Sequence, residues 1–174
     1  DDADAWQWSM RRAIEYVRKT QEPDGAWFGR WGVNHIYGTA AVLPALRAIG
    51  EDMRQDWIVA AADWVVAHQN NDGGWGESCA SYMDAEMRGK GDSTASQTAW
   101  ALMALLAMQD QAYRAPIELG LAYLVATQKA DGTWDEPQYT GTGFPGYGIG
   151  ARMDVSDTSS QRRLSQSTEL GRGF

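Results

Sequence analysis

Three short stretches of this sequence carry glutamine, aspartate, glycine and tryptophan at one spacing, Q-x-x-D-G-x-W. The glutamine amide can donate to carbonyls left free at a helix end, Asp-Gly favours a turn, and the tryptophan can pack back over the junction. Burying one such tryptophan contributes about 3 kcal/mol. We therefore interpret the pattern as a structural staple between helices, with ligand binding by the tryptophans as the alternative. Its defining residues are Gln21, Trp27, Gln69, Trp75, Gln128 and Trp134.

Other residues with reactive side chains lack the companions that a familiar site needs. His35 and His68 have no Cys or acidic neighbour at ligand spacing, so the sequence predicts no metal site and no cofactor. Ser78 and Ser96 lie outside any Gly-x-Ser-x-Gly pattern, which argues against a hydrolase triad. The single cysteine, Cys79, cannot form an internal disulfide.

Two kinds of helix alternate around the staples. Segments with one polar and one apolar face cover about residues 5–20, 54–69 and 115–128, and segments that are apolar nearly all round cover about 36–49 and 95–109. We expect the first kind to be outer helices and the second kind to be inner helices. Capping-box spacing supports three helix starts, at Asp4 with Gln7, Asp52 with Gln55, and Thr94 with Gln97.

This alternation predicts an all-α fold, an incomplete α/α barrel (toroid) in which each helix pair buries its face against its neighbours. Five such helices are too few to close a ring. We expect residues 1–146 to form the repeat segment. Residues 147–174 are rich in Ser, Asp, Arg and Gln, and we expect them to form an insertion loop and a truncated tail.

Charge and hydropathy exclude two classes of partner. The net charge of -8 argues against nucleic-acid binding, which needs clustered Lys and Arg. No run approaches the roughly 18 apolar residues of a transmembrane helix. We therefore expect no nucleic-acid partner and no spanning segment.

Several stretches between the staples resemble one enzyme family in its own order. Residues 24–34, 37–39, 73–77, 96–105 and 139–146 read DGAWFGRWGVN, YGT, GGWGE, SQTAWALMAL and YTGTGFPG. Together with the triple staple, which resembles the QW motif, they are similar to the bacterial squalene-hopene cyclases of the triterpene cyclase family. The resemblance covers about residues 8–146.

The resemblance implies an activity for a longer parent protein. Such enzymes have two α/α barrel domains with a cavity between them, where squalene is cyclised through carbocations to a hopane-type pentacycle. It also implies monotopic attachment to the cytoplasmic face of the bacterial inner membrane, and it leaves a homodimer as one option. The reaction starts at the middle Asp of an Asp-x-Asp-Asp motif. No such motif occurs in this sequence, and residues 1–4 have a different order, DDAD. We therefore expect this chain alone to be inactive.

Four aromatic residues match family positions that face the reacting hydrocarbon. Trp31 matches a tryptophan that lines the cavity near the first-formed ring, and Tyr37 matches a tyrosine that hydrogen-bonds toward the neighbourhood of the acid. Phe144 matches an aromatic residue that stabilises later cations, and Phe174 matches a second such phenylalanine after a long insertion. A hydrocarbon cation offers no hydrogen bond, so polarisable ring faces must stabilise it, each by about 2 kcal/mol when desolvated. The alternative is that these rings only pack the core.

Two rival functions remain at this stage. One is another terpene or oxidosqualene cyclase of the same architecture, which the sequence around the acid would distinguish. The other is a non-catalytic helical-repeat binding module, which would have no need for Trp31, Tyr37 and Phe144 within their surrounding motifs.

Overall fold

The computed structural model describes residues 2–138, 140 and 141, most of which are helical. The α-helices are α1 (Asp2–Lys19), α2 (His35–Ala48), α3 (Asp56–Ala67), α4 (Ala95–Met108) and α5 (Arg114–Thr127). Three short 3-10 helices lie between them, η1 (Cys79–Tyr82), η2 (Ala85–Met87) and η3 (Gln111–Tyr113). Every predicted helix is present with its ends within a few residues, and the described part has isolated β-bridges but no strand. The all-α prediction is confirmed.

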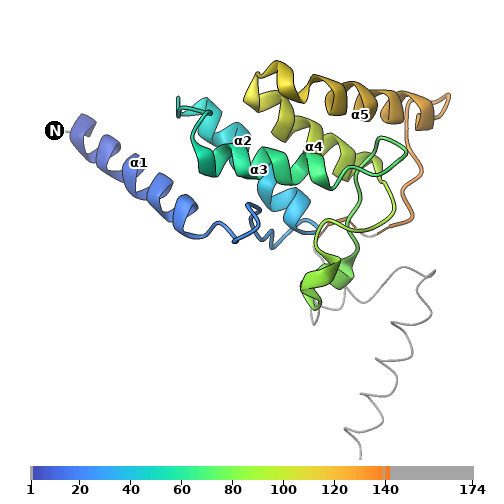
Figure 1. The fold of residues 1–174 in the computed structure, drawn as a ribbon, viewed down its shortest axis with the longest axis horizontal. Coiled ribbons are helices and arrows are strands. Elements are labelled where there is room, and N and C mark those ends of the chain that lie inside the picture. Colours follow the sequence, from blue (N-terminus) through green and yellow to red (C-terminus); the bar gives the residue numbers. More distant parts are fainter. Residues whose placement is uncertain (1, 139, 142–174) are drawn as a thin grey trace, which may run out of the picture.

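The inner helices α2 and α4 pack against each other and provide the centre of the core. Leu43 of α2 and Leu105 of α4 are fully buried, and so is Ile58, which α3 places against them. Figure 1 shows α1 at one end of the array and α5 running beside α4. The described helices form an open array that agrees with the predicted incomplete α/α barrel. None of these helices is long and apolar enough to cross a membrane.

Of the three predicted helix caps, the structure has the one at Thr94 but not those at Asp4 and Asp52. The Thr94 hydroxyl accepts from the Gln97 backbone N–H and caps α4, as expected. Asp4 lies inside α1, which begins earlier than predicted. The Asp52 carboxylate accepts from the backbone N–H of Arg54, within a turn that precedes α3. The predictions for Asp4 and Asp52 were therefore wrong.

The predicted tail, residues 147–174, lies outside the described residues. Phe144 and Phe174 lie outside them as well. Their roles stay predictions.

Candidate functional site

The three staples share one geometry, in which the glutamine closes the turn. The side-chain Nε2 of Gln21, Gln69 and Gln128 donates to the carbonyl of the glycine four residues later, over 2.8, 2.8 and 2.9 Å. In the first two staples the same nitrogen also donates to the start of the next outer helix, to the Trp57 carbonyl over 2.6 Å and to the Pro116 carbonyl over 2.9 Å. The glutamine therefore joins a turn to the following repeat.

The tryptophan indole satisfies the helix end that sequence reasoning assigned to the glutamine. Trp27, Trp75 and Trp134 donate from Nε1 to the carbonyl ten residues earlier, over 2.8, 2.7 and 2.9 Å. Each acceptor lies in the last turn of the preceding outer helix. The expected acceptor for the glutamine was wrong, because the indole donates to those carbonyls and the glutamine donates to the turn instead.

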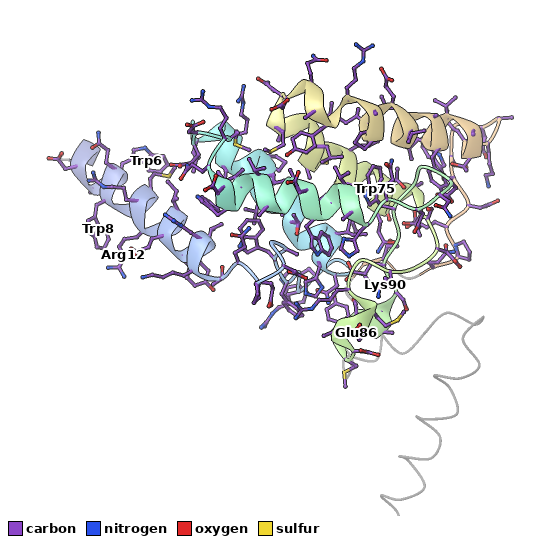
Figure 2. The ribbon with its side chains drawn as sticks, in the orientation of Figure 1. Trp6, Trp8, Arg12, Trp75, Glu86 and Lys90 are labelled. Atoms are coloured by element: carbon purple, nitrogen blue, oxygen red, sulfur yellow. The ribbon has the colours of Figure 1, made fainter. Side chains whose placement is uncertain are left out.

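An inner helix holds the staple from its other side. The backbone N–H of Trp27 donates to the Thr39 hydroxyl over 3.1 Å, and that of Trp75 donates to the Thr98 hydroxyl over 2.9 Å. Trp27 is 5% exposed and Trp75 is fully buried. Figure 2 labels Trp75 within the array of helices. These contacts support the interpretation of the pattern as a structural staple.

The third staple has an open side. Trp134 is 36% exposed, and Gln128 makes its turn bond from an exposed position. A Cβ on Gly73 would meet the Leu119 carbonyl oxygen at 2.7 Å, whereas one on Gly132 would meet nothing nearer than 4.0 Å within the described part. The neighbour that packs on the first two staples has no counterpart there among the described residues.

The first staple leads into the loop of residues 28–34, which carries Trp31 to the start of α2. The loop approaches the Tyr37 ring closely, since a Cβ on Gly32 would be 2.4 Å from Tyr37 Cγ. Tyr37 is half-buried and packs edge-on against Trp100 of α4, with ring centroids 5.0 Å apart. The Trp31 side chain is 62% exposed. Trp31 and Tyr37 thus belong to one loop-helix junction, and Trp100 adds a ring that was not singled out from the sequence.

A second loop meets this junction. Gly32 forms an isolated antiparallel bridge with Gly141, and the Val33 backbone N–H donates to the Thr140 carbonyl over 3.0 Å. The hydroxyl of Thr140 in turn donates to Glu136, next to Ser96 of α4. The chain at Thr140 and Gly141 therefore lies beside Gly32 and Val33, which follow Trp31.

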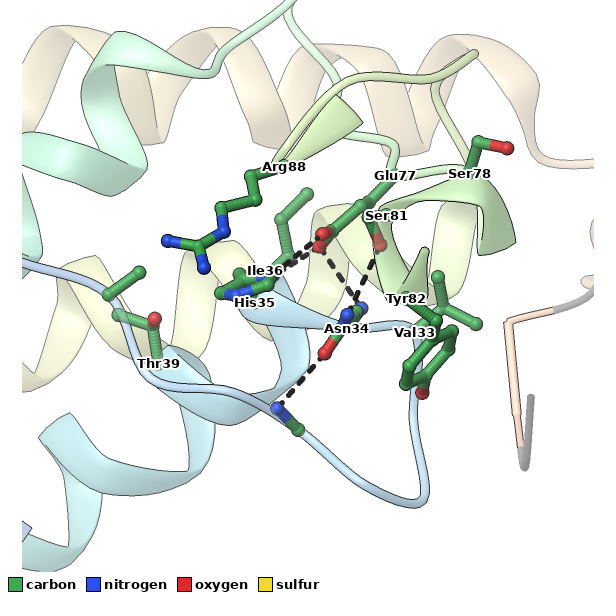
Figure 3. A network of polar contacts seen from close by, with 12 residues as sticks. Val33, Asn34, His35, Ile36, Thr39, Glu77, Ser78, Ser81, Tyr82 and Arg88 are labelled. Atoms are coloured by element: carbon green, nitrogen blue, oxygen red, sulfur yellow. Dashed lines mark hydrogen bonds and ion pairs between the residues drawn. The ribbon is translucent and has the colours of Figure 1, made fainter. Parts of the chain in front are cut away.

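A buried carboxylate lies beneath the junction. Glu77 is 4% exposed, and its Oε2 accepts from the backbone N–H groups of Asn34 over 3.0 Å and Ile36 over 2.9 Å (Figure 3). Its Oε1 lies 3.1 Å from Nδ1 of His35. Sequence reasoning missed this pair, because it looked for acidic companions of His35 at short spacing.

The environment of Glu77 favours its charged form. Burial alone raises the pKa of Glu77, but the hydrogen bond from His35 and those from the backbone N–H groups of Ile36 and Asn34 outweigh it and lower the pKa below its ordinary value. This carboxylate is thus engaged by donors. Within the described residues, no three or more His, Cys, Asp and Glu side chains converge as metal ligands would.

Comparison with known proteins identifies the family. Residues 2–149 match the model of the squalene-hopene cyclase C-terminal domain. The chain belongs to this family. It is 60% identical over 143 residues to the squalene-hopene cyclase of Alicyclobacillus acidocaldarius, covering 82% of this chain and 22% of that enzyme. It is 47% identical over 150 residues to the dammaradiene synthase of Dryopteris crassirhizoma, covering 79% of this chain and 22% of that enzyme. The chain thus spans about a fifth of the length of these relatives.

Solved structures agree on the fold. The type II terpene cyclase MstE from Scytonema superposes with a TM-score of 0.58 at 26% identity, over 75% of this chain and 35% of that one. The ent-copalyl diphosphate synthase from Streptomyces platensis gives a TM-score of 0.61 at 22% identity, over 80% of this chain and 25% of that one. As the C-terminal part of a squalene-hopene-type cyclase, the chain has the helical fold of terpene cyclases.

Proposed function

We propose that this chain forms one wall of the cavity in which its parent enzyme cyclises squalene through carbocations to a hopane-type pentacycle. The observation that carries the proposal is the junction where Tyr37 packs on Trp100 beneath the loop of Trp31. Membership in the family supports it. Phe144 joins the wall in this proposal through the loop that pairs Gly141 with Gly32.

The chemistry of the junction suits a hydrocarbon cation. Ring faces attract positive charge by about 2 kcal/mol when desolvated, and they neither add to the cation nor remove its proton. A free carboxylate would do both. The buried carboxylate of Glu77 is instead occupied by two backbone N–H groups and the His35 ring. On the resemblance alone, Phe174 is proposed as a second aromatic side chain that stabilises the later cations.

The acid that starts the reaction lies outside residues 1–174 in this proposal, so the isolated chain does not turn squalene over. Exchange of the matching segment tests the function. Residues 2–149 replace their counterpart in the Alicyclobacillus enzyme, and the products from squalene are identified by gas chromatography and mass spectrometry. We expect a pentacyclic hydrocarbon from the chimera. A folded chimera that leaves squalene unchanged would contradict the proposal.

Single substitutions in the chimera test the wall. Trp31→Ala and Phe144→Ala should each release partly cyclised or wrongly deprotonated hydrocarbons. Trp6→Ala is the matched control, since Trp6 is an exposed tryptophan on α1, 66% accessible and away from the junction (Figure 2). A product profile unchanged by Trp31→Ala would remove that residue from the site.

A second candidate is a different triterpene product. The likeness to a dammaradiene synthase favours it. The same product analysis decides, because a tetracyclic hydrocarbon from the chimera would support this alternative against the hopane skeleton.

We also propose that the parent enzyme attaches monotopically to the cytoplasmic face of the bacterial inner membrane, with a homodimer as one form of assembly. Support comes from the proposed substrate, a hydrocarbon that partitions from water into lipid. Membrane fractions washed at high pH and then with detergent test attachment, and sedimentation in detergent tests the dimer. Recovery of the parent enzyme in the aqueous fraction would contradict attachment.

A further inference from the structure

We propose that Glu77 is a positioning residue for the aromatic junction, acting through the start of α2 and not on the substrate. This inference rests on the proposed function. Glu77 follows the second staple by two residues, and its own backbone N–H donates to the side chain of Gln97 over 3.0 Å. The second repeat therefore fixes the position of Glu77, while the carboxylate oxygens accept hydrogen bonds from the first repeat.

Glu77 replaces the local cap of α2. Asn34, the N-cap residue, makes no side-chain capping bond, and the first turn of α2 contains no acidic residue. The free N–H groups at a helix start need acceptors, and a negative charge there is stabilising. Glu77 supplies both from 43 residues away, through its bonds to Asn34 and Ile36.

Because Glu77 caps the helix, the Asn34 side chain is free to close the loop. Its Oδ1 accepts from the Gly29 backbone N–H over 3.1 Å, and its Nδ2 donates to the Ser81 hydroxyl over 3.3 Å (Figure 3). Gln97 adds a bond from Nε2 to the Val33 carbonyl over 2.9 Å. The ends of the loop that carries Trp31 are thus tied to one cluster.

The same cap fixes Tyr37, which lies in the first turn of α2. Any shift of the helix start would move the Tyr37 ring relative to Trp100 and to Gly32, whose backbone approaches the ring so closely that a Cβ would not fit. A buried charge is costly to keep without full pairing. The full pairing of the buried Glu77 carboxylate therefore indicates a role that a neutral packing residue would not fill. That role is to hold Trp31 and Tyr37 in a fixed relative position.

Two variants in the chimera test this role. Glu77→Gln keeps the size and one acceptor oxygen, and Ser81→Ala removes a single hydroxyl from the cluster while sparing the cap. Glu86→Gln is the matched control, an exposed carboxylate in the same segment (Figure 2). For Glu77→Gln we expect kcat to fall by about tenfold to a hundredfold with KM nearly unchanged, and partly cyclised products to increase. Ser81→Ala should shift the products in the same direction by less, and Glu86→Gln should leave them unchanged.

A lower melting temperature with the wild-type product ratio would overturn the proposal, because that is the result of a purely structural role. An inactive wild-type chimera would instead count against the proposed function. Amide hydrogen exchange on the 174-residue chain decides in that case. Glu77→Gln should speed exchange at Asn34 and Ile36 by about tenfold or more, and also at Gly29, whose backbone N–H closes the loop on Asn34 Oδ1. Unchanged exchange at Gly29 would overturn the positioning role.

Discussion

The indole N–H of Trp75 donates to the Val65 carbonyl over 2.7 Å, and the whole side chain is buried between two helix types. The equivalent indole of Trp134 makes the same bond to Leu124 over 2.9 Å but is 36% exposed. Identical motifs are therefore buried to different degrees, depending on what packs over them.

The first prediction compares these two tryptophans. Trp75→Ala should lower the free energy of unfolding by about 3–5 kcal/mol, because it removes a fully buried ring together with its hydrogen bond to the Val65 carbonyl. Trp134→Ala should cost about 1–2 kcal/mol, since its ring is partly in solvent. Urea titration of the isolated chain measures both. Equal losses would show that the packing of the neighbouring repeat contributes little.

The second prediction separates backbone strain from a steric clash. Gly73 and Gly132 have nearly the same left-handed backbone, with φ of 86° and 85°. Alanine at either position should cost about 1–2 kcal/mol from strain. Gly73→Ala should cost about 1–3 kcal/mol more, because its Cβ would meet the Leu119 carbonyl oxygen at 2.7 Å. Thermal unfolding of both variants gives the comparison, and matching losses would contradict the clash.

The third prediction concerns acid. The folded-state pKa of Glu77 is lowered, so its contribution to stability is complete above the ordinary glutamate range and is lost as the pH falls into and below that range. Wild-type protein should therefore lose more unfolding free energy between about pH 7 and about pH 4 than Glu77→Gln does. His35 is the titratable group that faces Glu77, and it loses its ionic partner in Glu77→Gln, so both proteins are compared in a His35→Gln background.

Urea unfolding at the two pH values supplies the measurement. Exposed carboxylates with lowered pKa, such as Glu15 and Asp131, also respond to acid, but they are common to both proteins and cancel in the difference. Parallel pH profiles for wild type and Glu77→Gln would mean that Glu77 does not carry a stabilising charge.

The helices could be predicted because each one is encoded locally. Apolar periodicity and the repeated staple placed all five, and the Thr94 cap followed from a spacing of three residues. The cap predicted at Asp52 was wrong, because its carboxylate accepts from the nearer backbone N–H of Arg54. Local patterns therefore specify elements well but do not decide between competing short-range partners.

The junction could be predicted only in part. Trp31 and Tyr37 were named from a resemblance, and the structure places them on one loop and helix start. Glu77 was not found, because a cap that lies 43 residues from its helix leaves no pattern in the sequence. The Gly-Gly-Trp-Gly-Glu stretch and Asn34 both lie in segments that carry the resemblance, but nothing in the sequence indicated that Glu77 and Asn34 pair.

The last prediction tests the close approach between the loop and the ring beneath it. A Cβ on Gly32 would lie 2.4 Å from Tyr37 Cγ, so Gly32→Ala must lift the loop or tilt the ring. Gly141, the bridge partner of Gly32, has nothing within 4 Å of its Cβ position among the described atoms, and Gly141→Ala is the control. In the chimera, Gly32→Ala should reduce kcat by about tenfold or more and increase partly cyclised products, while Gly141→Ala should retain the parent profile. If both variants gave the parent product ratio, contact between the loop and Tyr37 would have no part in directing cyclisation.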